Sequence, residues 1–194
     1  HLSTLGIRCN VTLNTVFQAL WAAILSQVTK TTDIVFGVSS SGRPAEIPLI
    51  ETVVGPFVNN IPKRINCSID QDNERETLSR WLGSIQDQSL KALPYEFVSP
   101  VSIQQCSAVP LSSRLFESIL VFQNYHSAAS AMQLDAQVVI CPVELPEQTN
   151  YPITLVVRPG KRIELRGYFQ PGYLDHNQAK HLFIDFDTAI SAFV

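Results

Sequence analysis

The most restrictive feature of the sequence is an apolar segment with helical spacing, followed after a short polar turn by a continuous apolar run. Thr12 can cap a helix over residues 12–28. The apolar face of that helix comprises Val16, Phe17, Leu20, Ile24, Leu25 and Val28, widened by Ala19, Ala22 and Ala23. Residues 33–39, Asp-Ile-Val-Phe-Gly-Val-Ser, suit a strand that is buried on both faces. A buried helix beside a buried strand is typical of a layered domain.

The rest of the chain contains further segments with helical spacing of apolar residues and further short segments typical of strands. A second helix is predicted over about 73–91, with Leu78, Trp81, Leu82 and Ile85 on its apolar face. A last helix is predicted over about 176–193, where Asp175 and Gln178 can form a capping box. Strands are predicted over 115–122, 137–141, 153–157 and 162–168, and the last two form a hairpin in which Pro159-Gly160 makes a type II turn with positive φ at Gly160. This order predicts an α/β layered sandwich with a mixed β-sheet and flanking helices.

Composition limits the partners that a chain of this kind can have. The 194 residues are 45 % hydrophobic and 16 % charged, which suits one well-packed domain or lobe and argues against disorder. The net charge is −3, and Lys161, Arg162 and Arg166 alternate with Ile163 and Leu165 like the solvated face of a strand. We therefore expect no nucleic-acid partner. No apolar run reaches the roughly 20 residues of a membrane span, so we expect no membrane partner.

The cysteines give no sign of a metal site. Cys9, Cys67, Cys106 and Cys141 form no CxxC pair, and none neighbours a histidine. We expect buried free thiols. With no recognisable signal peptide, this pattern predicts the reducing cytoplasm.

Several short stretches resemble signatures of one known family. Residues 36–44, Phe-Gly-Val-Ser-Ser-Ser-Gly-Arg-Pro, resemble its strand followed by SGRP, and residues 54–64 match VGxFVNT-x-P-x-R, with Asn60 where Thr is usual. Residues 113–116, Ser-Arg-Leu-Phe, and residues 121–125, Val-Phe-Gln-Asn-Tyr, are similar to its SRxPLF and FQN segments. In this order and spacing they resemble condensation domains of nonribosomal peptide synthetases across essentially the whole chain. Pro44 and Phe57-Val58-Asn59 favour ordinary condensation over the epimerization relatives.

The resemblance implies a fold like chloramphenicol acetyltransferase, in which two lobes form a V around a substrate tunnel. Residues 1–194 correspond to the C-terminal lobe. The catalytic His-His-x-x-x-Asp-Gly element belongs to the N-terminal lobe, and the histidines here, His1, His126, His176 and His181, include no adjacent pair. The resemblance therefore implies that this chain holds no catalytic residue and is inactive alone. His176 and His181 are expected at the surface and His126 in a loop.

Six residues of the matched motifs are candidates for the wall of the tunnel: Gly42, Arg43, Asn59, Asn60, Gln123 and Asn124. The Asn124 amide either donates to a thioester carbonyl or caps its strand. Asn59 and Asn60 either hold a loop or face the tunnel, and Gly42 allows close approach of a pantetheine arm because it lacks Cβ. Arg43 either has a structural role, through a salt bridge or hydrogen bonds to loop carbonyls, or sets the charge of the tunnel.

The family's reaction joins two substrates that are carried on the phosphopantetheine of carrier proteins, so the resemblance implies no cofactor bound directly to this lobe. The implied partners are the N-terminal lobe, upstream and downstream peptidyl carrier proteins and an adjacent adenylation domain. The lobe would shape the tunnel and the carrier-protein docking surface, and its face toward the other lobe would be apolar. Two alternatives stay open: an acyltransferase that makes an ester or uses coenzyme A thioesters, and a non-catalytic scaffold lobe.

Overall fold

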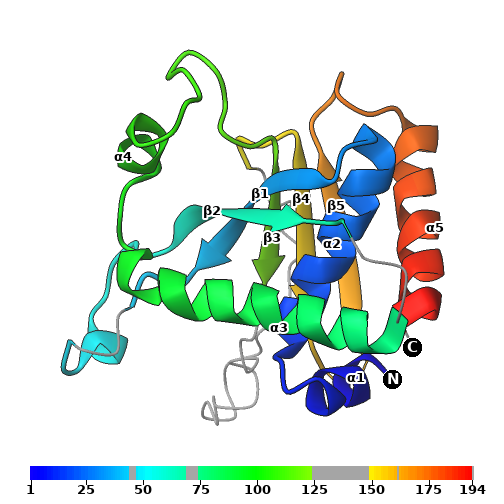
Figure 1. Cartoon of the computed structure of the whole chain (residues 1–194). Coiled ribbons are helices and arrows are strands. Elements are labelled where there is room, and N and C mark those ends of the chain that lie inside the picture. Colours follow the sequence, from blue (N-terminus) through cyan, green and yellow to red (C-terminus); the bar gives the residue numbers. More distant parts are fainter. Residues whose placement is uncertain (44–46, 69–73, 124–148, 161, 194) are drawn as a thin grey trace, which may run out of the picture.

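The computed structural model (Figure 1) describes residues 1–194 except 44–46, 69–73, 124–148, 161 and 194. The predicted strand over 137–141 lies outside the described residues, as do Pro44, Asn124, His126 and Cys141. The helices are α1 (Leu2–Arg8), α2 (Leu13–Thr29), α3 (Glu74–Ala92), α4 (Pro100–Gln105) and α5 (His176–Phe193), with short 3-10 turns at Ile50–Thr52 and Leu93–Tyr95. The strands are β1 (Asp33–Ser40), β2 (Asn59–Asn66), β3 (Ser118–Phe122), β4 (Ile153–Arg158) and β5 (Glu164–Phe169).

The strands form one mixed sheet in the order β2-β1-β3-β4-β5. The three central strands run parallel, and β2 and β5 pair antiparallel at the two edges. The layered α/β sandwich with a mixed sheet, predicted from the order of elements, is therefore confirmed.

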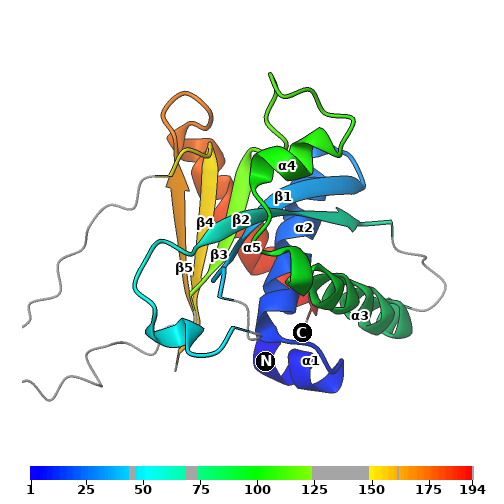
Figure 2. The same ribbon diagram turned by 90° about the vertical axis from the view of Figure 1, so that its left-hand side faces the viewer.

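One face of the sheet, here called the helix face, is covered by α2, α3 and α5 (Figure 2). Side chains that alternate along the strands point into this layer, among them Phe36, Leu120 and Leu155. They pack against the buried face of α2, where Phe17, Leu20 and Trp21 are fully covered. The side chains of the alternate strand residues point to the opposite face of the sheet, here called the second face.

Local capping fixes the two helices that the sequence predicts best. Thr12 Oγ1 accepts a hydrogen bond from the backbone N–H of Thr15 at 3.2 Å and so begins α2. At α5, Asp175 Oδ1 accepts from the N–H of Gln178 and Gln178 Oε1 accepts from the N–H of Asp175, both at 2.8 Å. This reciprocal pair is the predicted capping box.

Strand β2 is the main element that the periodicity missed, because residues 52–62 show no clean pattern. It pairs with β1 along its full length, and Pro62 faces Gly37 within the pairing. Proline lacks the N–H that a central strand needs, but β2 is an edge strand, where proline is tolerated. Helices α1 and α4 were also missed, since each is too short for a clear period.

The hairpin of β4 and β5 is confirmed, but its predicted type II turn is wrong. Arg158 pairs with Glu164, so the five residues 159–163 connect the strands. The φ of Gly160 lies outside the left-handed range that a type II turn requires.

Two expectations about burial are also wrong. Val28 is 55 % exposed because it lies in the last turn of α2, beyond the packed layer. Cys106 is exposed, and Cys9 and Cys67 are only half-buried, although all three are free thiols. Each of the three directly follows the last residue of a helix or strand, where packing is incomplete.

Within the described ranges, no single helix is long and apolar enough to cross a membrane. Helices α1 and α2 reach that length and composition only as a pair, and the pair is bent by 108°.

Candidate functional site

Three motif-bearing segments meet at one edge of the sheet, here called the carboxyl edge. Strands β1 and β3 run parallel and end there at Ser40 and Phe122, while β2 runs the opposite way and begins there at Asn59. Residues 39–43, 57–60 and 121–123 are therefore neighbours in space despite their separation in sequence (Figure 1). Asn124, the sixth predicted site residue, follows directly but lies outside the described residues.

A polar pair occupies the second face at this edge. Val38 belongs to the packed layer of the helix face, so its neighbour Ser39 points to the second face, as does its pairing partner Asn60. Ser39 Oγ donates to Asn60 Oδ1 at 2.6 Å. This bond sets the orientation of the Asn60 amide, whose Nδ2 group has no hydrogen bond to the described part of the chain.

Gln123 belongs to a second polar group at the same edge. Its backbone N–H donates to the Val157 carbonyl at 2.8 Å, and its Oε1 accepts from Arg158 Nε at 2.7 Å. Arg158 Nη1 also lies 3.9 Å from Glu164 Oε2 at the start of β5. The end of β3, the end of β4 and the start of β5 are thus joined by a backbone hydrogen bond, a side-chain hydrogen bond and an ion pair.

Gly42 and Arg43 order the loop that leads from β1 to β2. Gly42 has a φ of 61° and packs against the backbone of Phe57. Arg43 Nη2 donates to the Val53 carbonyl at 3.0 Å, Nη1 donates to the Ile50 carbonyl, and the guanidinium carbon lies 4.4 Å from the centre of the Phe57 ring. Of the two alternatives for Arg43, its contacts are those of a residue that binds loop carbonyls.

Asn59 points to the helix side of the edge, away from Asn60. Its Nδ2 donates to the carbonyls of Glu96 and Val98, both at 2.8 Å. Ser40 Oγ donates to the Glu96 carboxylate. The segment between α3 and α4 is therefore tied to the ends of both β1 and β2, as expected if Asn59 holds a loop.

Sequence reasoning missed Lys63, which is only 8 % exposed. Its Nζ donates to the Ile85 carbonyl at 2.7 Å and to Ser89 Oγ at 2.8 Å, both on α3. Burial lowers the pKa of Lys63 from its ordinary value of 10.5 to about 8, because the charged form loses hydration. The signal was present in the sequence: Lys63 is in phase with Ile61 and Ile65 on one face of β2.

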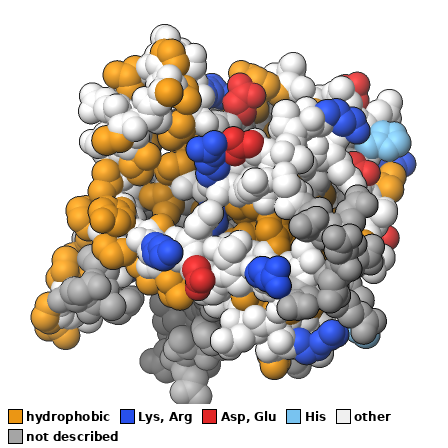
Figure 3. All heavy atoms as spheres, in the orientation of Figure 1, with side chains coloured by type: hydrophobic (Ala, Val, Ile, Leu, Met, Phe, Trp, Pro, Cys, Tyr) orange, Lys and Arg blue, Asp and Glu red, His pale blue; other side chains and the backbone are white. Residues whose placement is uncertain are grey.

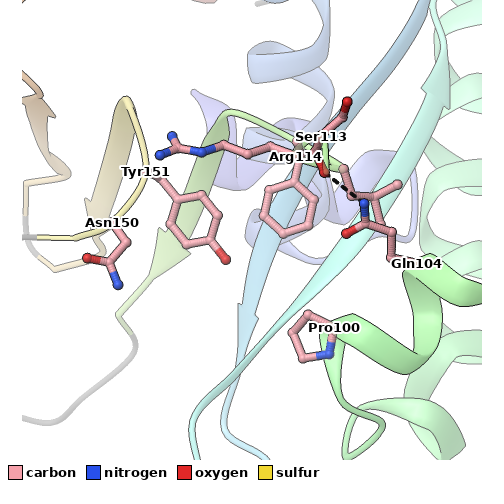
Figure 4. A pocket seen from close by; sticks show the side chains of 8 residues that line it. Pro100, Gln104, Ser113, Arg114, Asn150 and Tyr151 are labelled. Carbon is pink, nitrogen blue, oxygen red and sulfur yellow. Dashed lines mark hydrogen bonds between the residues drawn. The ribbon is translucent and has the colours of Figure 1, made fainter. Parts of the chain in front are cut away.

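The fourth motif, residues 113–116, lies at the other end of the sheet, before β3. It borders a pocket of about 280 Å³ together with Pro100, Asn150 and Tyr151. Gln104 Nε2 donates to the carbonyl of Ser113 at 2.7 Å, and Figure 4 shows it reaching there from α4 while Arg114 points away. Phe116 stacks on Tyr151 with ring centres 5.2 Å apart. Arg114 is thus separated from Gln123 by the length of β3.

Exposed hydrophobic side chains occur on the segments next to the carboxyl edge and on α4. This set, here called the apolar rim, comprises Val53, Val54, Val58, Leu93, Tyr95, Phe97 and Val101. Val54 is 98 % exposed. Figure 3 shows hydrophobic surface on the side of the molecule that carries α4 in Figure 1. An apolar surface of this kind is typical of an interaction site.

Comparison with models of known protein families shows to which family the chain belongs. Residues 3–194 match the family described as the condensation domain. This chain belongs to the condensation-domain family. The resemblance read from the sequence motifs is therefore confirmed.

The condensation-domain chain is similar to parts of very long synthetases. It is 40 % identical over 168 residues to one of the linear gramicidin synthase subunits of Brevibacillus parabrevis, which is 87 % of this chain and 3 % of that protein. It is 36 % identical over 164 residues to a chondramide synthase of Chondromyces crocatus, which is 84 % of this chain and 4 % of that protein. The condensation-domain chain thus spans a small fraction of these relatives.

Solved condensation domains share its fold. The condensation domain of the monacolin K polyketide synthase superposes with a TM-score of 0.75 at 15 % identity, over 99 % of this chain and 43 % of that one. The first condensation domain of the calcium-dependent antibiotic synthetase, solved with a substrate analogue, gives 0.73 at 13 % identity, over 99 % and 41 %. The predicted chloramphenicol acetyltransferase-like fold is confirmed by these neighbours.

Proposed function

We propose that this chain is the C-terminal lobe of a condensation domain that forms amide bonds between carrier-bound substrates. In that reaction the amine of an acceptor aminoacyl thioester attacks the carbonyl of a donor thioester, an amide bond forms and the donor thiol leaves. The observation that carries the proposal is the convergence of the three motif segments at the carboxyl edge. The two solved condensation domains align with this chain over 41–43 % of their length, which supports a lobe rather than a whole domain.

The second face at the carboxyl edge is the part that we assign to the wall of the substrate tunnel. Ser39 holds Asn60 Oδ1, so the Asn60 Nδ2 group is oriented as a donor toward whatever lies above the second face. An amide donor in that position stabilises a thioester carbonyl as negative charge develops on its oxygen. Gln123 and the adjoining Asn124 extend the same polar edge.

The remaining parts of the reaction are assigned to partners. The other lobe supplies the general base, since the four histidines here include no adjacent pair. We place that lobe against the apolar rim, whose exposed side chains lie on the segments next to the carboxyl edge and on α4. Upstream and downstream carrier proteins bring the two thioesters on phosphopantetheine, and an adenylation domain loads the acceptor. The three free thiols of the described residues fit a reducing cytoplasm.

The test uses the full protein encoded by the reading frame that contains this chain. It is incubated with one carrier protein loaded with a donor aminoacyl group and a second loaded with an acceptor, and mass spectrometry follows transfer to the second carrier. The wild type should form the amide. The variant Asn60→Ala should slow the transfer by about threefold to tenfold, the effect of one hydrogen bond to the reacting carbonyl.

Asn66→Ala is the matched control. Asn66 lies on the same strand and the same face, but at the opposite end of β2, where its Oδ1 binds the N–H of Ser68. This variant should transfer at the wild-type rate. Transfer only to a hydroxy-acid acceptor would favour an ester-forming acyltransferase instead. Carrier binding without any transfer would favour a scaffold lobe.

A further inference from the structure

Glu96 binds to both β1 and β2 at the carboxyl edge. It directly follows the short 3-10 turn Leu93–Tyr95 and is half-buried. Its carboxylate accepts a hydrogen bond from Ser40 Oγ, and its backbone carbonyl accepts one from Asn59 Nδ2 at 2.8 Å. Ser40 is the last residue of β1, Asn59 is the first residue of β2, and the two face each other in the pairing. Glu96 therefore holds both members of the last pair of the β1–β2 ladder.

The bond between Ser40 and Glu96 is part of a longer chain of hydrogen bonds. Ser40 Oγ accepts from the backbone N–H of Gly42 at 3.3 Å and donates its one hydrogen to the Glu96 carboxylate. Ser40 is only 9 % exposed, and Glu96 has no ion-pair partner among the residues that the structure describes. A hydrogen bond to a carboxylate is stronger than one between neutral groups, and a chain of such bonds strengthens each member. The Glu96 carboxylate thus fixes the end of β1 and the start of the loop that follows it.

The last pair of the ladder controls the pair next to it, Ser39 and Asn60. Side chains alternate along a strand, so Ser40 and Asn59 point to the helix face whereas Ser39 and Asn60 point to the second face. The backbone N–H of Asn60 also donates to Asn59 Oδ1 at 3.0 Å. The end of a strand opens more readily than its middle, and opening of the last pair would turn the backbone that carries the Asn60 amide. Contacts on the helix side therefore keep that amide in place on the second face.

We propose that Glu96 is a positioning residue for amide transfer, which holds the Asn60 Nδ2 donor toward the thioester through Ser40 and Asn59. The inference rests on the proposed function, in which Asn60 belongs to the wall of the substrate tunnel. Glu96 acts through other residues and does not touch the substrate, because its contacts lie on the helix side and Asn60 points to the second face.

The transfer assay with the full protein tests this role in a double-mutant cycle. Glu96→Ala should slow amide formation by about threefold to tenfold, because the Ser40 hydroxyl loses its acceptor and the Asn60 donor loses its place. In protein that already carries Asn60→Ala, the same change should slow transfer by less than about twofold, since no donor remains to be positioned. A purely structural role of Glu96 would instead slow both proteins by the same factor.

Two variants serve as controls for the cycle. Glu96→Gln keeps an oxygen acceptor for Ser40 and the backbone carbonyl for Asn59, so transfer should stay within about twofold of the wild-type rate. Glu117→Ala removes an exposed carboxylate directly before β3, at the opposite end of the sheet, and should leave the rate unchanged. If Glu96→Ala does not fold, Ser40→Ala removes the same hydrogen bond from its donor side and should give the same cycle.

Hydrogen exchange of the full protein gives a measurement that does not depend on activity. In Glu96→Ala the backbone amides of residues 39–42 and 57–60 should exchange faster than in the wild type, whereas Glu117→Ala should leave them unchanged. Unchanged exchange in Glu96→Ala, or the same loss of rate with and without Asn60, would overturn the role of Glu96. The proposed function would then still stand, provided that the wild type transfers. A wild type that forms no amide would overturn the proposed function and, with it, the role assigned to Glu96.

Discussion

The carbonyl oxygen of Phe57 lies 1.7 Å from the position that a β-carbon on Gly42 would take. Gly42 also has a φ of 61°, in the left-handed region that side chains rarely adopt. Gly42 follows β1 and Phe57 precedes β2, so this backbone contact closes the loop that brings two motif segments together. The glycine of the SGRP motif is therefore required by the fold of this chain itself.

Replacing this glycine should be costly. Gly42→Ala should lower the free energy of unfolding by more than about 2 kcal/mol, because the new methyl group meets backbone and the positive φ becomes strained. Gly83→Ala is the matched control. Gly83 lies inside α3 with nothing within 4 Å of its β-carbon position, so alanine should raise stability there by about 0.5–1 kcal/mol. Urea denaturation measures both, and equal effects would contradict the role of Phe57.

The free energy of unfolding of the chain should rise with pH through the range in which Lys63 loses its proton. Burial lowers the pKa of Lys63 to about 8 in the folded chain, whereas the unfolded value is the ordinary 10.5. Between these values the unfolded chain binds more protons, so stability rises as pH increases from 8 to 10.5. The rise should be on the order of 2–3 kcal/mol, and the unfavourable burial of the charge is present in full below about pH 8.

Lys63→Met isolates this effect from the other titrating groups. Urea denaturation at about pH 7, 8, 9 and 10 should show the wild type gaining stability relative to the variant as pH increases. Two parallel profiles would show that Lys63 titrates normally in the folded chain.

The two hydrogen bonds of Asn59 should hold the segment between α3 and α4. Asn59→Ala removes the donor to the Glu96 and Val98 carbonyls, so the free energy of unfolding should fall by about 1–3 kcal/mol. Amide hydrogen exchange should become faster over residues 93–98 in particular. Asn177→Ala, at an exposed site on α5, is the control and should leave that exchange unchanged. Uniformly faster exchange across the sheet would contradict a local role.

The cysteines should differ in their rates of alkylation. Burial raises the pKa of the Cys67 thiol, although a hydrogen bond with Ser26 lowers it in part. Cys106 is exposed, so iodoacetamide should modify it well before Cys67 under native conditions. Peptide mapping by mass spectrometry follows each site, and the difference should vanish in denaturant. Comparable native rates at the two sites would show that the Cys67 thiol is not shielded.

The sequence predictions were accurate where the stabilising contacts join residues close together in the sequence, and they failed where the contacts depend on strand order or register. The N-termini of α2 and α5 were predicted closely, because Thr12, Asp175 and Gln178 form capping hydrogen bonds with residues three positions away. Strand β2 was missed because Pro62 and Lys63 interrupt its pattern. The place of β2 at the edge of the sheet makes Pro62 acceptable, and hydrogen bonds to α3 satisfy the buried Lys63. The positive φ expected at Gly160 depended on a turn length that the register of β4 and β5 does not have.

The candidate site also combines features that the sequence predicts and features that depend on the tertiary structure. The motifs identified the family and marked Gly42, Arg43, Asn59, Asn60 and Gln123 as candidates, since those residue types and spacings are properties of the sequence itself. Only the tertiary structure decided that Asn60 turns to Ser39 while Asn59 turns to Glu96 and Val98, and that Lys63 is buried against α3. Those contacts join residues 21 to 39 positions apart in the sequence. Strand order and pairing register create such neighbours, and neither is encoded in local periodicity.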